Sequence, residues 1–131
     1  FQALRIFVNK EITELINGVI KATKKLKPGG KIIVISFHSL EDKIIKYFFT
    51  NFSKNRSKSS RYIPESELID SSLFDDYRNR VFRPSIEEVN LNNRSRSAKL
   101  RFAIRSKNKF EYPKNLIKKF KKYLDLEAIN V

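Results

Sequence analysis

The sequence predicts an α/β fold that contains part of an open, mostly parallel sheet. Three observations carry this prediction: an amphipathic segment at 2–26, an apolar run at 32–35, and a second amphipathic segment at 40–50. Helix, strand and helix in this order are typical of α/β sheets. The chain has 131 residues, which is enough for one hydrophobic core.

The first predicted element is a single helix over residues 2–26. Its apolar residues recur at spacings of three and four, which places them on one helix face. They are Leu4, Val8, Ile12, Leu15, Ile16, Val19 and Ile20. The run Pro28, Gly29 and Gly30 predicts the end of the helix before residue 28.

The run at 32–35 is β-branched and apolar on both faces. Such a run is typical of a central strand that is covered on both sides. We therefore expect a fully buried strand flanked by the helices 2–26 and 40–50. The later elements cannot cover both its sides, so we also expect further parallel strands outside this chain. A first residue other than Met agrees with a fragment.

Residues 53–80 are polar and of mixed charge, and we expect a surface loop there. A short strand is predicted at 81–82, before Pro84. A capping-box spacing then predicts a brief helix at 86–91.

Alternation predicts a strand at 98–105. Its inward face is expected to carry Leu100, Phe102 and Ile104. Its outward face is expected to carry Lys99, Arg101 and Arg105. The main unit is predicted to span residues 1–105, and residues 106–131 are expected to form a basic tail.

The tail is predicted to contain an amphipathic helix from residue 115. Its inward residues are Leu116, Ile117, Phe120, Tyr123 and Leu124, and its outward residues are Lys118, Lys119, Lys121 and Lys122. This helix could pack on the protein, lie on RNA, or contact anionic lipid.

The net charge of +14, from 28 Lys+Arg and 14 Asp+Glu, predicts an anionic partner. Nucleic acid ranks before an anionic membrane surface, and mere solubility is the alternative. The absence of Cys excludes disulfides and thiolate chemistry, and a single His leaves no metal constellation. No apolar run reaches membrane-spanning length. We expect a cytoplasmic protein without a metal or a membrane.

The turn at 36–39 follows the apolar run, at the strand end where open α/β sheets bind ligands. His38 could be a polar contact, a general base, or simply a structural hydrogen-bonding group. Ser39 is better explained as a helix cap than as a nucleophile. Glu41 and Asp42 suit the first turn of a helix, where the dipole favours anions.

A dense cationic patch lies late in the chain, and it consists of Arg94, Arg96, Lys99 and Arg101. Arginine forks hold phosphates, and the serine hydroxyls between them add hydrogen-bond donors. A solvated loop is the alternative. We expect these four side chains on one rim, near the carboxyl end of the strand 32–35 or beside that strand, in contact with RNA. The pair Gly29 and Gly30 precedes a strand, the reverse of a nucleotide-binding loop, so no cofactor-binding residue is assigned.

Five segments of the sequence carry a family resemblance: 1–6, 8–9, 26–30, 35–42 and 94–101. They resemble the 16S rRNA cytosine-N4 methyltransferases (the RsmH, or MraW, family), and the segment 35–42 (ISFHSLED) is the most specific. The resemblance covers residues 1 to about 105. Asn93 stands where the family usually has Pro, which bears only on the rigidity of that loop.

The resemblance implies the C-terminal part of a Rossmann-like class I methyltransferase sheet that uses S-adenosyl-L-methionine. The implied reaction methylates the N4 amine of a decoding-site cytosine in 16S rRNA of the small ribosomal subunit. The family's donor site lies upstream of Phe1. The chain alone is therefore expected to be inactive and to bind no donor.

Site residues also follow from the resemblance. Ser36 and His38 are expected to line the floor near the donor, as candidate catalytic residues. Gln2 and Arg5 are expected to reach the target base or its phosphate. Two other classes stay open: a non-catalytic basic RNA-binding module associated with the ribosome, and a membrane-surface adaptor that uses the tail. The coding sequence upstream of Phe1 discriminates the enzyme from the module.

Overall fold

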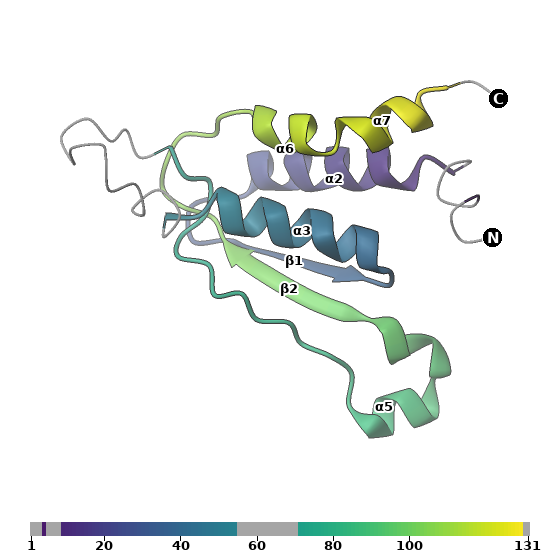
Figure 1. Cartoon of the computed structure of the whole chain (residues 1–131). Coiled ribbons are helices and arrows are strands. Elements are labelled where there is room, and N and C mark those ends of the chain that lie inside the picture. Colours follow the sequence, from purple (N-terminus) through teal and green to yellow (C-terminus); the bar gives the residue numbers. More distant parts are fainter. Residues whose placement is uncertain (1–3, 5–8, 55–70, 130–131) are drawn as a thin grey trace.

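The computed structural model describes residues 4, 9–54 and 71–129 (Figure 1). Its sheet consists of β1 (Lys31–Ser36) and β2 (Lys99–Ile104), which run antiparallel. The register pairs Ile33 with Phe102 and Ser36 with Lys99. The predicted strands at 32–35 and 98–105 are confirmed. The parallel pairing expected around β1 is not found among the described strands.

β1 is not the fully buried central strand that its composition predicts. Within the described residues it pairs with β2 alone, and its side chains alternate between buried and exposed. Ile32 is buried, whereas Ile33 and Ile35 are 59% and 54% exposed. The apolar run indicates two faces that favour burial, but the described chain supplies a cover for only one of them.

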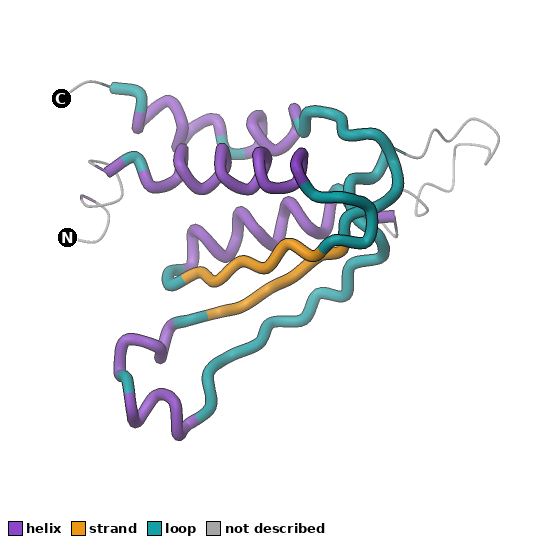
Figure 2. Tube along the Cα trace, turned by 180° about the vertical axis from the view of Figure 1, so that it is seen from behind, coloured by secondary structure: helices purple, strands orange, loops and turns teal. Residues whose placement is uncertain are grey.

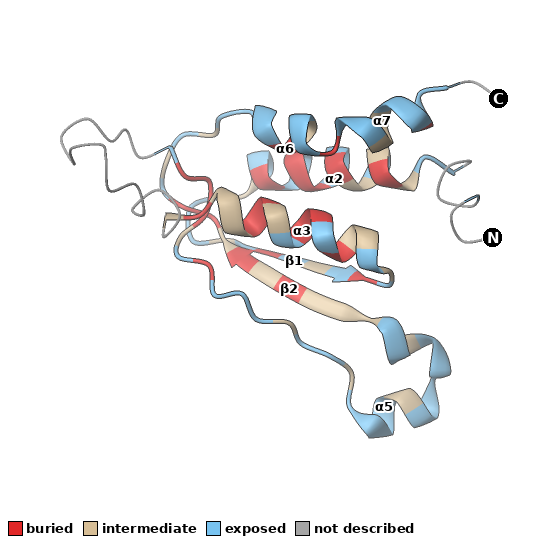
Figure 3. Cartoon of the chain, in the orientation of Figure 1, coloured by how far each residue is buried: buried red, intermediate tan, exposed pale blue. Residues whose placement is uncertain are grey.

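Four helices cover the same side of the sheet, as Figures 1 and 2 show. They are α2 (Glu11–Lys25), α3 (Ser39–Asn51), α6 (Lys114–Lys119) and α7 (Lys121–Glu127). The predicted helix at 40–50 is confirmed as α3. Buried positions face one another where these helices meet (Figure 3). The largest fully buried side chains include Phe48, Phe49, Phe74, Phe120, Ile12 and Ile16.

The helix predicted over residues 2–26 is interrupted at Lys10, and residues 2–3 and 5–8 of that span lie outside the described residues. Lys10 adopts a left-handed conformation with φ of 52°, and the helix α2 begins at Glu11. Leu4, assigned by periodicity to the buried face, is 63% exposed. The predicted end is confirmed, because α2 stops at Lys25 and the turn that follows holds Gly29 at φ of 84°, where glycine carries no steric penalty.

The prediction of a surface loop over 53–80 is wrong for part of its length. Residues 55–70 lie outside the described residues, but Leu73, Phe74 and Tyr77 are buried. The ring of Phe74 packs edge-on at 5.1 Å from Phe48, between centroids. Three apolar side chains of this polar stretch therefore belong to the core, and the N–H groups of Leu73 and Phe74 donate to the Phe52 carbonyl.

The residues that lead from Tyr77 to β2 contain the remaining described elements. Phe82 makes an isolated antiparallel bridge to Leu100, on the edge of β2 away from β1. The predicted helix at 86–91 is confirmed as α5 (Ile86–Leu91), whose cap is the hydroxyl of Ser85 accepting from the Glu88 N–H at 3.1 Å. A 3₁₀ helix, η2 (Asn93–Ser97), leads directly into β2.

The tail packs on the core instead of extending from it. The single helix predicted from residue 115 is divided at Phe120 into α6 and α7. The predicted inward residues are buried or half-buried, and the predicted outward lysines are exposed, as the amphipathic pattern predicts. Leu116 and Phe120 belong to the same core as Ile12 and Ile16.

Candidate functional site

The helix α3 begins at the carboxyl end of β1, and its cap is His38. The chain is extended at His38 (φ −140°, ψ 161°), and Nδ1 accepts a hydrogen bond from the Glu41 N–H at 3.3 Å. The expectation that Ser39 caps the helix is wrong by one residue, since Ser39 is already the first helical residue. An imidazole nitrogen can take the role of a serine hydroxyl because it, too, accepts from a free backbone N–H.

Glu41 completes this turn from the other side. Its Oε1 accepts from the Phe37 N–H at 3.1 Å, so the two side chains satisfy backbone donors reciprocally, as in a capping box. Glu41 Oε1 also lies 3.2 Å from His38 Nε2. The turn at 36–39 is therefore held rigidly where the sequence places the candidate site.

The hydrogen bonds of His38 decide what its imidazole can do. Because Nδ1 accepts from a backbone N–H, the proton of the neutral ring lies on Nε2. The side chain is 7% exposed, and among the described residues Nε2 has no partner in hydrogen-bond geometry. Its neighbours are the carboxylates of Glu41 and, at 3.9 Å, Glu11. In this state His38 is a donor with no free basic nitrogen, which disfavours the general-base role.

Asp42 and Arg101 form a buried ion pair between α3 and β2. The Arg101 Nε donates to Asp42 Oδ1 at 2.7 Å, and Nη2 donates to Oδ2 at 3.1 Å. Nη1 donates to the Tyr77 hydroxyl and to Asn79 Oδ1. The side chains of Arg101 and Asp42 are 5% and 12% exposed. Bidentate geometry of this kind fixes one side chain against the other.

The pKa of Asp42 follows from this pairing. Burial by itself raises that pKa, but the hydrogen bonds and the charge of Arg101 outweigh burial and hold the pKa below its ordinary value. The carboxylate is therefore charged at neutral pH. The earlier explanation of Asp42 by the helix dipole alone misses its main interaction.

Burial and pairing therefore disfavour the expected contact of Arg101 with RNA. Its guanidinium is enclosed and its donors are directed at Asp42, Tyr77 and Asn79. The face of β2 expected to point outward is the buried one, since Arg101, Ala103 and Arg105 are buried. The face with Leu100, Phe102 and Ile104 is only half-buried. The alternation was right, and the assignment of its two faces was inverted.

Arg94 and Arg96 lie on the exposed 3₁₀ helix η2. Since Ser36 pairs with Lys99, the end of η2 at Ser97 is adjacent to the carboxyl end of β1, as predicted. Lys99 is half-buried, with Nζ 3.9 Å from Asp42 Oδ2. We call Arg94, Arg96 and Lys99 the arginine rim.

Ser95, between the two arginines of the rim, has a local role. The Ser95 hydroxyl donates to the Asn92 carbonyl at 2.8 Å, and Asn92 Oδ1 accepts from the Arg94 N–H at 3.1 Å. These bonds shape the turn that presents the two arginines. Ser36, the other candidate, is buried at the end of β1. Gln2 and Arg5 lie outside the described residues.

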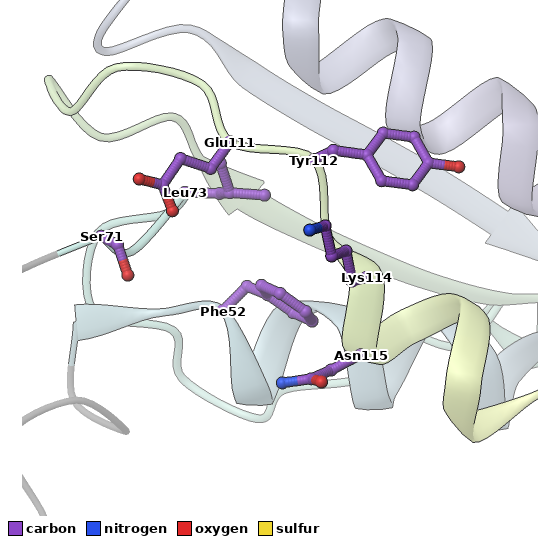
Figure 4. A pocket seen from close by; sticks show the side chains of 7 residues that line it. All are labelled: Phe52, Ser71, Leu73, Glu111, Tyr112, Lys114 and Asn115. Atoms are coloured by element: carbon purple, nitrogen blue, oxygen red, sulfur yellow. The ribbon is translucent and has the colours of Figure 1, made fainter.

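Two cavities lie beside the described elements. The larger, about 530 Å³, lies where the C-terminal end of α3 meets the start of the tail (Figure 4). Its lining is Phe52, Ser71, Leu73, Glu111, Tyr112, Lys114 and Asn115. A smaller cavity of about 150 Å³ is bordered by Ile35, Phe82 and Leu100. Neither includes Ser36 or His38.

Residues 9–54 and 71–129 contain no cluster of three His, Asp or Glu side chains suited to a metal ion. No helix in the same ranges is long and apolar enough to cross a membrane.

The fold and the site together define an α/β segment with a polar turn at the carboxyl end of a strand. The model of the MraW methylase family matches residues 1–106, so the chain belongs to that family. Similar proteins include the ribosomal RNA small subunit methyltransferase H of Bartonella quintana, 48% identical over 106 residues. The proteins of the same name from Agrobacterium fabrum and Ehrlichia chaffeensis are 44% and 48% identical, over 106 and 101 residues.

These matches cover most of this chain and a minority of each relative. The Bartonella quintana match spans 81% of this chain and 31% of the relative. The Agrobacterium fabrum and Ehrlichia chaffeensis matches span 81% and 77% of the chain, and 30% and 31% of those proteins. Most of the tail lies beyond the matched residues 1–106.

Proposed function

We propose that this chain is part of an enzyme that methylates small-subunit ribosomal RNA in the cytoplasm. The observation that carries the proposal is the family match over residues 1–106, together with relatives named ribosomal RNA small subunit methyltransferase H. The finer proposal, methylation of the N4 amine of a decoding-site cytosine in 16S rRNA, rests on the resemblance of segment 35–42.

A larger, Rossmann-like sheet is part of the same proposal. The sheet face away from the helices exposes Ile33 and Ile35, opposite the half-buried Leu100 and Phe102. A contiguous apolar surface of this kind favours a covering partner. The relatives have more than two-thirds of their length outside the match, which supports further polypeptide as that cover.

S-adenosyl-L-methionine is the proposed methyl donor, and the described residues do not form a cradle for it. The one pair of adjacent glycines lies at the amino end of β1, and both N–H groups are used. Gly29 donates to the Arg105 carbonyl and Gly30 to the Lys27 carbonyl. Donor binding is therefore proposed to lie in the part of the enzyme outside this chain.

The roles proposed for this chain's own residues concern position and RNA. Ser36 and His38 line the floor of the site, and His38 acts as a positioning residue because its Nδ1 caps α3. Gln2 and Arg5 are proposed to contact the target base or its phosphate. The arginine rim holds rRNA phosphates next to that floor.

The proposal is tested by methyl transfer to small ribosomal subunits that lack the modification. The full-length gene product with S-adenosyl-L-methionine should produce N4-methylcytosine in 16S rRNA, detected by mass spectrometry of nucleosides. The 131-residue chain alone should transfer no methyl group and show no donor binding by calorimetry, because it lacks a donor cradle. Specific donor binding by the isolated chain contradicts the placement of the donor site, and a full-length product that methylates no rRNA contradicts the function.

The arginine rim gives a separate prediction for the full-length enzyme. Arg94→Ala with Arg96→Ala should weaken rRNA binding and flatten its dependence on log salt concentration by roughly one to two units, since each lost phosphate contact counts about 0.7 for single strands. Donor affinity should stay unchanged. Filter binding across a salt series measures the slope. An unchanged slope in the double variant contradicts the RNA role of the rim.

A non-catalytic RNA-binding module is the second candidate. It is favoured by one observation: the chain has a net charge of +14, and its described residues form no donor cradle. A start codon immediately upstream of Phe1 supports the module, whereas an upstream strand followed by a glycine-rich loop supports the enzyme.

A further inference from the structure

The tail lies antiparallel to α2, and this orientation aligns two rows of lysines. Figure 1 shows α6 and α7 running back along α2. The register is fixed at one end, where Glu127 accepts from the Ile12 and Thr13 N–H groups. Thirteen residues lead from Ile12 to Lys25, and thirteen lead back from Glu127 to Lys114. At ~1.5 Å per helical residue both paths span about 20 Å, so Lys114 lies level with Lys25.

The same register separates the charges along the two helices. Lys118 lies level with Lys21, and Lys24 follows one turn further along α2. At the other end, Asp125 lies level with Glu14. Positive charge therefore gathers at the C-terminal end of α2, and negative charge gathers at its N-terminal end.

We call the positive end the lysine end. It consists of Lys21, Lys24, Lys25, Lys27, Lys114 and Lys118. All six are exposed, and no ion pair joins any of them to a carboxylate of the described residues. Spacings of three and four place the lysines of each helix on one stripe.

Local helix stability explains only part of the lysine end. Lys24 and Lys25 suit the last turn of α2, where the helix dipole favours cations. Lys114 begins α6, where the same effect disfavours a cation. Its position next to the end of α2 therefore indicates an anionic partner that both rows share.

We propose that the lysine end is a second RNA-binding surface, which holds the phosphate backbone without reading sequence. Lysines in two exposed rows act as point charges and suit a phosphate chain. The lysine end lies beyond the amino end of β1, whereas the arginine rim lies at its carboxyl end, about 20 Å away at ~3.3 Å per residue. The choice of RNA rests on the proposed function.

An anionic membrane is the competing partner, and the distribution of apolar residues disfavours it. A helix that lies on a membrane inserts apolar side chains between its basic residues. Among the exposed large apolar residues of the tail, Leu126 and Ile129 lie at the acidic end of the helix pair, and Tyr112 precedes α6, outside the two helical rows of lysines. Lys114 and Lys118 belong to the part of the tail that the family match does not cover.

The experiment measures binding of the 131-residue chain to a generic single-stranded RNA across a salt series. Lys114→Gln with Lys118→Gln should reduce the slope against log salt by about 1.4, and adding Lys21→Gln with Lys24→Gln should reduce it by about 2.8 in total. The matched control is Lys10→Gln with Lys122→Gln, because both lysines are exposed and lie toward the acidic end of the helix pair. The control should leave the slope unchanged, and circular dichroism should show every variant folded.

Three results overturn the inference. Equal slope losses in the control pair assign the effect to net charge, and unchanged slopes in the lysine-end variants show no phosphate contact there. The third is that the lysine-end variants lose binding to anionic phosphatidylserine vesicles while their RNA binding is unchanged. The arginine-rim variant and the methyl-transfer assay report on the proposed function separately. A lysine-end effect in a protein without methyltransferase activity supports the surface and rejects only the enzyme.

Discussion

Arg101→Ala should lower the free energy of unfolding by about 3–5 kcal/mol, because it leaves the buried carboxylate of Asp42 without its partner. Tyr77 and Asn79 lose the same guanidinium. Urea denaturation followed by circular dichroism measures the change. The matched control is Arg96→Ala, an exposed arginine whose loss should cost less than about 0.5 kcal/mol.

Acid should act on the same pair. The pKa of Asp42 in the folded protein lies below its ordinary value of 3.8, so the stabilisation is present above that value and is lost as the pH falls through the folded pKa. Arg101→Ala should remove this part of the acid sensitivity.

A double variant, Asp42→Leu with Arg101→Met, should be less destabilised than either Asp42→Leu or Arg101→Met alone, since no lone charge is left buried. Equal losses for Arg101→Ala and Arg96→Ala contradict the structural role of the pair.

The elements were predictable from the sequence because their signals are local. Periodicity identified α3 and the buried face of α2, alternation identified β2, and a capping spacing identified α5. The cover of the sheet was not predictable, because it depends on which elements pack on each face. Leu100 and Phe102 suited an inward face by composition, yet the helices lie on the other side, over Arg101 and Ala103.

The candidate site was predictable in its location and only partly in its chemistry. The polar turn after an apolar strand indicated the position of Ser36 and His38, and the arginine crowding indicated the rim. The ion pair of Asp42 with Arg101 joins residues 59 positions apart, so no local pattern reveals it. One signal was available: Arg101 shares its face of β2 with Ala103, a small residue that leaves room for packing against a helix.

The tail provides the second large expected effect. Glu127 is 3% exposed, and it accepts from the Ile12 N–H, the Thr13 N–H and the Thr13 hydroxyl at 2.7–3.1 Å. Lys10 gives α2 no side-chain cap, so Glu127 satisfies donors at the start of that helix from 115 residues away.

Glu127→Ala should therefore lower the free energy of unfolding by about 1–3 kcal/mol, since it leaves backbone donors unsatisfied in a buried environment. Amide hydrogen exchange should accelerate first in α7 and in the opening turn of α2. Asp125→Ala is the matched control, because Asp125 is exposed on the same helix. Glu127→Gln, which keeps one acceptor oxygen, should fall between wild type and Glu127→Ala. If Glu127→Ala is as stable as Asp125→Ala, the tail is held by Leu116 and Phe120 alone. The contact of Glu127 with α2 then does not fix the register that aligns the lysine end.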